Sequence, residues 1–194
     1  MPELPEVETV VRQLNEKVSG REIVKLDILD EKFVDSKIKK ILPIKINKVD
    51  RRGKSIIFNL SEGQFLLAHL RMTGHFHFVD QEIDGDSDDS YLNYMVAKIF
   101  FKDKSFLTHN SIRRFGSLKL LNQEELNKEL SKLGPEPLEK SFTKELFYQR
   151  ISSFPNSNLK NKLLDQKLIA GIGNIYAQEA LYHAKIHPER KVGQ

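Results

Sequence analysis

The N-terminal stretch MPELPEVETV has the residue types for covalent chemistry, because a proline directly follows the initiator methionine. A small second residue allows that methionine to be removed, which leaves Pro2 as a secondary amine. Since α-amino groups titrate at about 7.7–8.0, a usable fraction is an unprotonated nucleophile at neutral pH. Its condensation with an aldehyde gives an iminium that stays cationic and acts as an electron sink. Glu3 and Glu6 can shuttle protons nearby, although Met-Pro starts are common and acids also complement a helix dipole.

A second candidate is the segment AGIGNIYAQEA (170–180), in which Gly171 and Gly173 form a tight connection before a helix. Asn174 is expected to be the N-cap of that helix. Glycines let the backbone approach a ligand, and the N–H groups at a helix N-terminus bind phosphate. The segment is not a dinucleotide fingerprint, because no strand precedes it and no third glycine follows. A plain turn between two helices is the alternative interpretation.

Three short segments carry basic groups, and in two of them an aromatic or thioether side chain lies beside the basic group. In IRRFG (112–116) an arginine pair precedes Phe115 between two expected strands, as a wedge inserted into a nucleic-acid duplex would require. In RRGKS (51–55) Lys54 follows a glycine at the start of a strand, and HLRMTG (69–74) occupies the end of another. The alternative interpretation of IRRFG is an arginine on a solvated face beside a buried phenylalanine. None of the three segments is specific enough to indicate a function by itself.

Apolar spacing predicts the elements that must position these residues. Val7, Val10, Val11, Leu14 and Val18 follow helical periodicity, so a helix is expected from Pro5 to Gly20. Short β-type segments then follow without intervening helices, which predicts an antiparallel sandwich or barrel. These segments are 21–29, 44–50, 54–60, 64–70, 75–79, 94–101, 104–110 and 114–121, with a tight turn at 61–63 and a mobile loop over 80–89.

The pattern after the strands is helical. A short amphipathic helix is expected over 123–133, and the two prolines of 135–141 favour an interdomain linker. Further helices are expected over 143–153, 158–168 and 174–184, the last with an apolar stripe of Ala177, Ala180, Leu181 and Ala184. The chain is therefore predicted to be α+β, with a β domain over 1–134, a linker, and an all-α domain over 142–194.

Charge and composition narrow the class of function. The chain has 31 Lys and Arg against 27 Asp and Glu, and six of those acids with no base lie in 80–89. The net charge of +4 is therefore +10 over the rest, which suggests a polyanionic partner such as nucleic acid. A solvated basic surface without a partner explains the charge equally well. The absence of Cys excludes disulfides, thiol nucleophiles and Cys-ligated metals from this chain. Without a long apolar run or a signal segment, a cytoplasmic location away from membranes is expected.

The order of these motifs along the chain indicates a particular protein family more specifically than any single motif does. MPELPEVETV, RRGK, HLRMTG, RRFG, LGPEPL and KNKLLDQKLIAGIGNIYAQEALYHAKIHP extend over essentially all of residues 1–190. The chain resembles the formamidopyrimidine-DNA glycosylase family, also called 8-oxoguanine DNA glycosylase, and its LPEVE start looks like that branch rather than endonuclease VIII. The resemblance implies a β-sandwich with flanking helices followed by a helix–two-turn–helix DNA-binding domain.

The resemblance also implies an activity and roles for particular residues. Family members flip a damaged purine out of duplex DNA, cleave its glycosidic bond, and nick the abasic strand by β,δ-elimination. Damaged double-stranded DNA is thus the expected partner, the expected state is a monomer, and a nucleoid association is expected when DNA is bound. The resemblance implies that Pro2 is the nucleophile, Glu3 the acid that transfers a proton, and Glu6 a supporting carboxylate. It implies that Lys54 acts in β-elimination and contacts a phosphate. Met72, Arg113 and Phe115 are implied to fill the space that the flipped base leaves, and His69, Lys160 and Asn174 to bind phosphates.

The chain departs from the family pattern in three places. Family members continue into a zinc finger with four cysteine ligands and a phosphate-gripping arginine, whereas this sequence ends at Gln194 without Cys, so no zinc or other cofactor is expected in it. The segment FPNSN (154–158) lacks the usual basic run, and THNSI (108–112) lacks the usual acidic turn before RRFG. Two hypotheses stay open: a bifunctional glycosylase and lyase, or a shortened member that binds DNA weakly with lyase activity at most. The sequence leaves the preferred lesion open.

Overall fold

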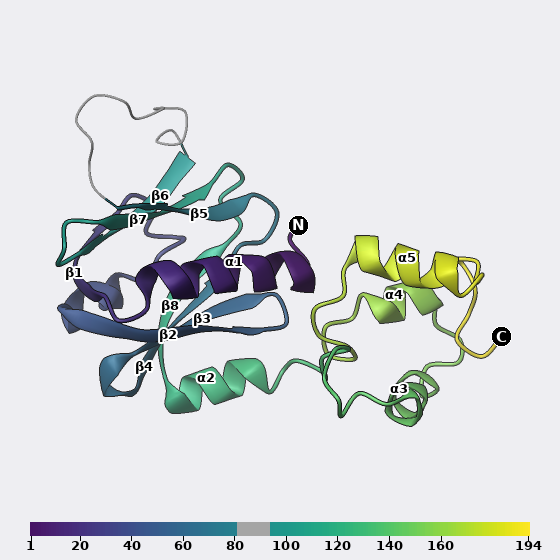
Figure 1. Cartoon of the computed structure of the whole chain (residues 1–194). Helices are drawn as coiled ribbons and strands as arrows, with labels where there is room; N and C mark the ends of the chain where they lie inside the picture. The colour runs from purple at the N-terminus through teal and green to yellow at the C-terminus, as the bar shows by residue number, and fades with distance from the viewer. Residues whose placement is uncertain (81–93) are drawn as a thin grey trace. The chain divides into compact units, whose positions relative to one another are not determined.

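The computed structural model describes residues 1–80 and 94–194, which form two compact units (Figure 1). Unit 1 comprises residues 1–51 and 55–126, and unit 2 comprises residues 52–54 and 127–194. The sequence favours a boundary at 134, whereas the division between the units falls after Leu126, and the expected linker 135–141 belongs to unit 2. Apart from Asp80, the loop expected over 80–89 lies outside the described residues.

Unit 1 is built on one eight-stranded sheet with the strand order β5-β7-β6-β1-β2-β3-β4-β8. Its strands are β1 (Glu22–Ile28), β2 (Ile44–Arg52), β3 (Ser55–Leu60), β4 (Gln64–His69), β5 (Gly74–Val79), β6 (Met95–Phe101), β7 (Phe106–Ser111) and β8 (Ser117–Asn122). Two short 3-10 turns, η1 (Ser36–Ile41) and η2 (Ser61–Gly63), lie between strands, the second at the expected hairpin turn. The strands therefore follow the predicted segments closely.

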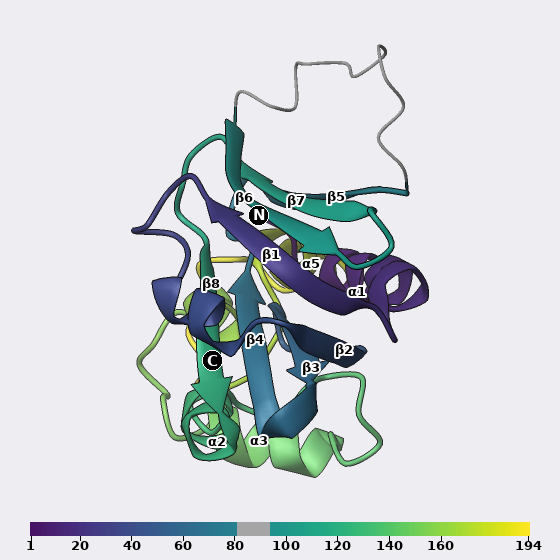
Figure 2. The same ribbon diagram turned by 90° about the vertical axis from the view of Figure 1, so that its left-hand side faces the viewer.

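The sheet folds over on itself where β1 meets β2. These strands pair at one end, through Glu22 with Lys45 and Ile23 with Ile44. β5, β7, β6 and β1 then form one layer, and β2, β3, β4 and β8 form the other (Figure 2). The prediction of an antiparallel sandwich with flanking helices is confirmed, with both layers belonging to one continuous sheet.

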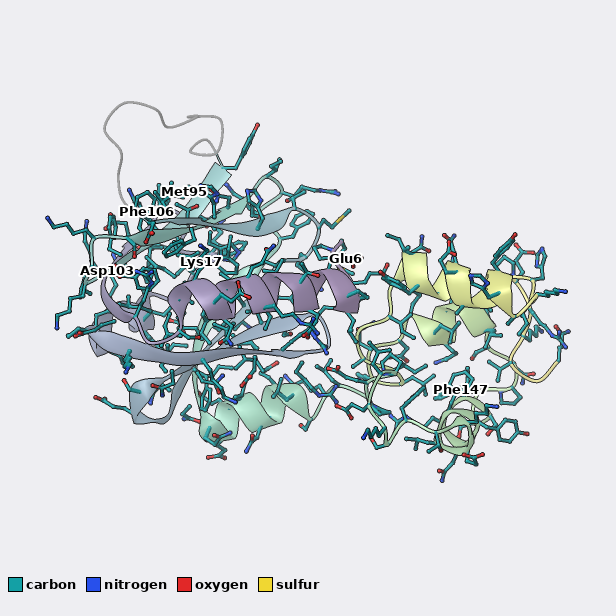
Figure 3. All side chains as sticks on the ribbon, viewed as in Figure 1. Glu6, Lys17, Met95, Asp103, Phe106 and Phe147 are labelled. Atoms are coloured by element: carbon teal, nitrogen blue, oxygen red, sulfur yellow. The ribbon has the colours of Figure 1, made fainter. Side chains whose placement is uncertain are left out.

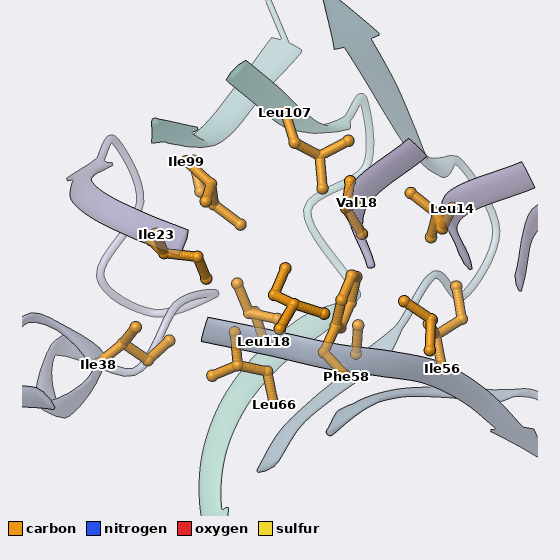
Figure 4. Packing of buried hydrophobic residues seen from close by; sticks show 14 of the residues in the cluster. Leu14, Val18, Ile23, Ile38, Ile56, Phe58, Leu66, Ile99, Leu107 and Leu118 are labelled. Carbon is orange, nitrogen blue, oxygen red and sulfur yellow. The ribbon is translucent and has the colours of Figure 1, made fainter. Parts of the chain in front are cut away.

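Apolar side chains from both layers fill the space between them (Figure 4). Phe58 and Leu66 come from one layer, and Ile99 and Leu107 from the other. Helix α1 (Leu4–Val18) runs along the open side of the sandwich and contributes its buried stripe to the same core. It begins one residue before the predicted Pro5, because the N-cap is Glu3.

The helices from residue 123 onward are α2 (Gln123–Leu130), α3 (Lys144–Ile151), α4 (Leu159–Leu163) and α5 (Asn174–His183). In unit 2 the helices α3, α4 and α5 enclose a separate small core that includes Ile151, Leu163 and Leu181. The predicted apolar stripe of α5 is only half right, because Ala177 and Leu181 are buried while Ala180 and Ala184 are exposed. Within the described ranges, no helix is long and apolar enough to cross a bilayer.

Helix α4 is much shorter than the predicted 158–168, because the chain turns immediately after Leu164. The Gln166 side chain holds that turn: its Nε2 donates to the carbonyls of Leu164 and Ile172, and its Oε1 accepts from the Gly171 backbone N–H at 2.9 Å. A side chain that bonds backbone on both sides of a turn replaces the helical hydrogen bonds that end there. These bonds fix the path of the connection between α4 and α5.

Candidate active site and nucleic-acid interface

The start of α1 holds the acidic residues that follow Pro2. Glu3 is only 2% exposed and caps the helix, while Pro2 is half-buried and Met1 is half-exposed. The Glu6 carboxylate accepts a hydrogen bond from the Glu3 backbone N–H at 2.8 Å, and the Glu3 side chain accepts from the Glu6 backbone in return. This reciprocal capping box fixes Glu3 next to Pro2. Figure 3 shows Glu6 at this end of α1.

An ion pair also fixes the next turn of α1. The Glu8 carboxylate lies 2.8 Å from Nε of Arg51, at the end of β2, and 2.8 Å from Nε of Arg12. The hydrogen bond from Arg51, followed by that from Arg12, lowers the pKa of Glu8 below its ordinary value. The carboxylate is therefore charged at neutral pH and ties α1 to the end of β2, where the RRGKS segment begins.

Lys54 follows Gly53 on the turn between β2 and β3, and residues 52–54 belong to unit 2 although the rest of both strands belongs to unit 1. Lys54 is buried. Glu136, itself buried, accepts a hydrogen bond from the Gly53 backbone N–H at 2.6 Å and lies 3.1 Å from Nη1 of Arg52. Arg52 also donates to the carbonyl of Gly134 at 2.7 Å. The LGPEPL segment thus holds the backbone of the lysine turn in place.

Gly53 gives the lysine turn its backbone conformation. Its φ of +56° lies in the left-handed region that glycine adopts at little cost. A Cβ there would stand 3.5 Å from the side chains of Ala170 and Leu133 and 3.7 Å from the Gly171 nitrogen. The lysine turn and the AGIG connection are therefore neighbours within unit 2.

Met72, Arg113 and Phe115 lie together, on two loops of unit 1. The Arg113 guanidinium donates to the Met72 sulfur at 3.0 Å and lies 5.2 Å from the Phe115 ring centroid. Met72 is 49% exposed and Phe115 60% exposed. A thioether, a cation and an aromatic ring thus form one protruding group, here called the wedge, with the size and chemistry to occupy a gap between stacked bases.

Gly116 sets the backbone path just after the wedge. A Cβ on this residue would lie 2.5 Å from the His69 carbonyl oxygen and 2.5 Å from the Phe33 ring, so only glycine fits. His69 is half-buried at the end of β4, and its Nδ1 faces the Arg71 backbone N–H at 3.3 Å. His69 is therefore close to the wedge loops, whose backbone it contacts.

Lys160 and Asn174 belong to α4 and α5, which pack against each other in unit 2 (Figure 1). Lys160 is half-buried in the first turn of α4, and Asn174 is exposed. Asn174 is not the N-cap, as predicted from the sequence, but the first residue of the helix, because Gly173 takes the cap position. The Asn174 amide is turned along the helix toward Gln178 at 3.5 Å. The helix start consequently presents backbone N–H groups beside an exposed amide.

Comparisons with known proteins agree with this arrangement of residues and folds. Residues 1–118 match the family model of the formamidopyrimidine-DNA glycosylase N-terminal domain, and residues 133–194 match that of its H2TH domain. The chain belongs to the formamidopyrimidine-DNA glycosylase family.

Individual relatives give the extent of the similarity. The formamidopyrimidine-DNA glycosylases of an Exiguobacterium species and of Mycoplasma pneumoniae are 36% and 38% identical to it. The alignments cover 98% and 97% of this chain and 69% of each relative. The solved structure of the Lactococcus lactis Fpg with DNA containing an abasic site matches with a TM-score of 0.88 and 32% identity, over 99% of this chain and 70% of that one.

The zinc implied by the formamidopyrimidine-DNA glycosylase resemblance does not fit the residues present. The 194-residue sequence contains no Cys. Over residues 1–80 and 94–194, no group of three or more His, Asp or Glu side chains is arranged to hold a metal. No step of the chemistry below is therefore assigned to a metal ion.

Sequence reasoning missed two residues that organise this glycosylase site. Glu136 holds the lysine turn, and Gln166 shapes the connection between α4 and α5. LGPEPL stands out as a motif in the sequence, but only the tertiary contact to Gly53 shows what its glutamate, Glu136, does. For Gln166 the only available signal is its place just before AGIG. Of the predicted residues, Pro2, Glu3, Glu6, His69 and the wedge belong to unit 1, and Lys54, Lys160 and Asn174 to unit 2.

Proposed function

We propose that this protein is a base-excision DNA glycosylase and abasic-site lyase that removes oxidised or ring-opened purines from duplex DNA. Its expected substrates are 8-oxoguanine and formamidopyrimidine. Family membership supports the glycosylase class, and relatives from Lactococcus lactis are solved with DNA that contains an abasic site or Fapy-dG. The observation on which the proposal rests is the buried carboxylate of Glu3, locked by the capping box directly beside Pro2.

The chemistry begins with removal of Met1, which frees the Pro2 nitrogen. That nitrogen attacks the sugar C1′, the glycosidic bond breaks, and the base departs with the bonding electrons and takes up the proton that the attacking amine loses. Glu3 then delivers its own proton to the ring oxygen, so the C1′–O bond of the ring breaks, the sugar opens and a cationic iminium is left on Pro2. Glu6 supports this step by holding Glu3 in position. The iminium acidifies the C2′ proton, whose loss expels the 3′-phosphate, and δ-elimination expels the 5′-phosphate.

The remaining residues bind and deform the DNA. Lys54 assists β-elimination and contacts a phosphate, and His69, Lys160 and Asn174 bind further phosphates. The wedge fills the space left by the extruded nucleotide, which offsets part of the few kcal/mol needed to unstack and unpair a base. The sequence-level alternative, weak binding with lyase activity at most, assigns the same chemistry to Pro2 but no productive flipping.

Borohydride trapping tests the nucleophile. Reduction of the iminium should link the protein covalently to abasic DNA, with the adduct mapped to Pro2 by mass spectrometry. Pro2→Gly should trap far less, since a primary amine forms the iminium less readily, while Pro5→Ala, the control on the neighbouring proline, should trap as the unaltered protein does. Equal trapping by Pro2→Gly, or an adduct on Lys54, would remove Pro2 from its role.

A second assay separates the proposal from its alternative. Matched duplexes carrying either 8-oxoguanine or a preformed abasic site are incubated with the protein at low and at physiological salt. Excision of 8-oxoguanine together with strand cleavage supports the bifunctional enzyme. Cleavage of the abasic duplex alone, confined to low salt, supports the weakly binding lyase.

A further inference from the structure

The two loops that carry the wedge are crossovers between the layers of the sandwich. Residues 70–73 connect β4 to β5, and residues 112–116 connect β7 to β8. In one layer β5 pairs with β7 as far as Gly74 opposite Ser111, and in the other β4 pairs with β8 as far as His69 opposite Ser117. At either end of the two crossovers, a pair of neighbouring strands therefore holds them side by side.

Thr73 joins the crossovers between these anchors. Thr73 is half-buried, and its hydroxyl oxygen accepts a hydrogen bond from the Arg113 backbone N–H at 3.0 Å. Its carbonyl oxygen lies 3.3 Å from Nδ1 of His75, a residue of β5. The contact between Arg113 and Met72, in contrast, joins two exposed side chains through a sulfur, which is a weak acceptor. The Thr73 hydroxyl therefore fixes the backbone from which two of the three wedge residues project.

Both crossovers contain backbone that needs such support. Arg71 has a φ of +55° and Arg114 a φ of +49°, in the left-handed region that residues with side chains rarely adopt. Such conformations persist where surrounding contacts determine them. Thr73 follows Arg71 by two residues and Met72 by one, and its hydroxyl bonds to Arg113, the residue before Arg114.

We propose that Thr73 is a positioning residue that pre-organises the wedge for insertion into DNA. This inference rests on the proposed function, in which Met72, Arg113 and Phe115 occupy the space of the extruded nucleotide. Side chains held in place before binding lose less conformational entropy when they insert. Loss of the Thr73 hydroxyl should therefore slow insertion and base extrusion and leave later chemistry at an abasic site unaltered.

The test compares Thr73→Val, which keeps the shape but removes the acceptor, with Thr73→Ser, which keeps the hydroxyl. Thr9→Val is the matched control, because the Thr9 hydroxyl donates to the Pro5 carbonyl on the exposed face of α1. Stopped-flow fluorescence of 2-aminopurine beside 8-oxoguanine reports unstacking directly. Single-turnover excision and cleavage of a preformed abasic site, at saturating protein, report the chemistry.

Thr73→Val should slow the fluorescence change and excision about fivefold, as expected for one neutral hydrogen bond. Abasic cleavage should change less than twofold, and Thr73→Ser should restore both rates. If the fluorescence rate is unaltered in Thr73→Val but slow in Met72→Ala, Thr73 has no positioning role, whereas the wedge keeps its role. Equal losses in unstacking and abasic cleavage would also overturn the role of Thr73, as a general defect. If the fluorescence rate is also unaltered in Met72→Ala, the wedge has no role in base extrusion, and the inference about Thr73 is overturned with it.

Discussion

At the scale of single residues, His109 is the most unusual side chain of unit 1. It is fully buried, with Phe33 edge-on at 4.7 Å and Phe76 at 4.2 Å between ring centroids. Neither ring nitrogen has a hydrogen-bond partner among the residues that the structure describes. Burial, with a smaller contribution from the nearby charge of His75, lowers the pKa of His109 to about 3. The imidazole is thus neutral in the folded protein, and it backs the Phe33 ring against which Gly116 packs.

This buried histidine should make unit 1 sensitive to acid. The unfolded chain binds a proton at His109 below about pH 6.5 and the folded chain only near pH 3, so stability is lost as the pH falls between these values. The slope is about 1.4 kcal/mol per pH unit, or roughly 2 kcal/mol between pH 6.5 and 5. Urea unfolding of the parent and His109→Phe at pH 7.5 and 5.0 should show that the variant loses about 2 kcal/mol less.

The exposed His77 of the neighbouring strand β5 provides the control for that measurement. His77→Gln should keep the full pH dependence of the parent. If His109→Phe and the parent lose equal stability between the two pH values, the acid sensitivity belongs to other groups.

At the scale of elements, the capping box at the start of α1 gives Glu6 a structural task that its charge alone does not reveal. The Glu6 carboxylate is exposed, but it accepts the Glu3 backbone N–H at 2.8 Å. An amide oxygen can accept the same bond, whereas a methyl group cannot. The cap and the charge of Glu6 can therefore be separated by two substitutions.

Glu6→Gln should keep stability within a few tenths of a kcal/mol, and Glu6→Ala should lose about 1 kcal/mol because the cap is lost. If Glu6 acts by holding Glu3, cleavage of preformed abasic DNA should survive in Glu6→Gln to within about threefold and fall further in Glu6→Ala. Thermal unfolding and single-turnover cleavage measure the two effects, with exposed Glu16→Ala as the helix control. Equal loss of cleavage in both variants would assign the role to the charge.

The same scale shows what the sequence could predict and what it could not. The spacing of Val7, Val11, Leu14 and Val18 determines one buried helical face, so α1 was predictable. Helix α4 was overpredicted, because its end depends on bonds from the Gln166 side chain to residues beyond the helix. Apolar alternation likewise cannot predict that the polar β7 residues Thr108 to Ser111 are buried.

The candidate site divides in the same way. The chemistry proposed for Pro2 and Glu3 follows from residue types at adjacent positions. IRRFG itself predicts a wedge with Arg113 and Phe115, and Met72 joins it only through the ordered motifs that resemble a family. Thr73 and Glu136 carry no local signal, since each acts on a backbone N–H far away in the sequence. The residues proposed to bear the chemistry can thus be named from the sequence, whereas those that hold them in place are visible only in the folded structure.

At the scale of the whole molecule, charge should govern affinity for DNA. Outside the acidic segment 80–89 the chain carries a net charge of +10, and residues 143–194 hold eight bases against four acids. Phosphate contacts release counterions, so the logarithm of the binding constant falls with the logarithm of salt at about −0.9 per contact. The salt slope therefore counts phosphate contacts, and one substitution at a time can identify them.

Lys160 is the lysine of unit 2 that is predicted to contact a phosphate, and it is half-buried in the first turn of α4. Lys144 serves as the control, because it is an exposed lysine of the same unit, at the start of α3, with no predicted role. Lys160→Ala should make the salt slope shallower by about 0.9, whereas Lys144→Ala, with the same change in net charge, should leave it within about 0.3. Fluorescence anisotropy with abasic-analogue duplexes from about 50 to 300 mM salt, in steps of about 50 mM, measures both slopes. Equal changes in the two variants would mean that Lys160 acts only through the overall field of the protein, and its assignment as a phosphate contact would be lost.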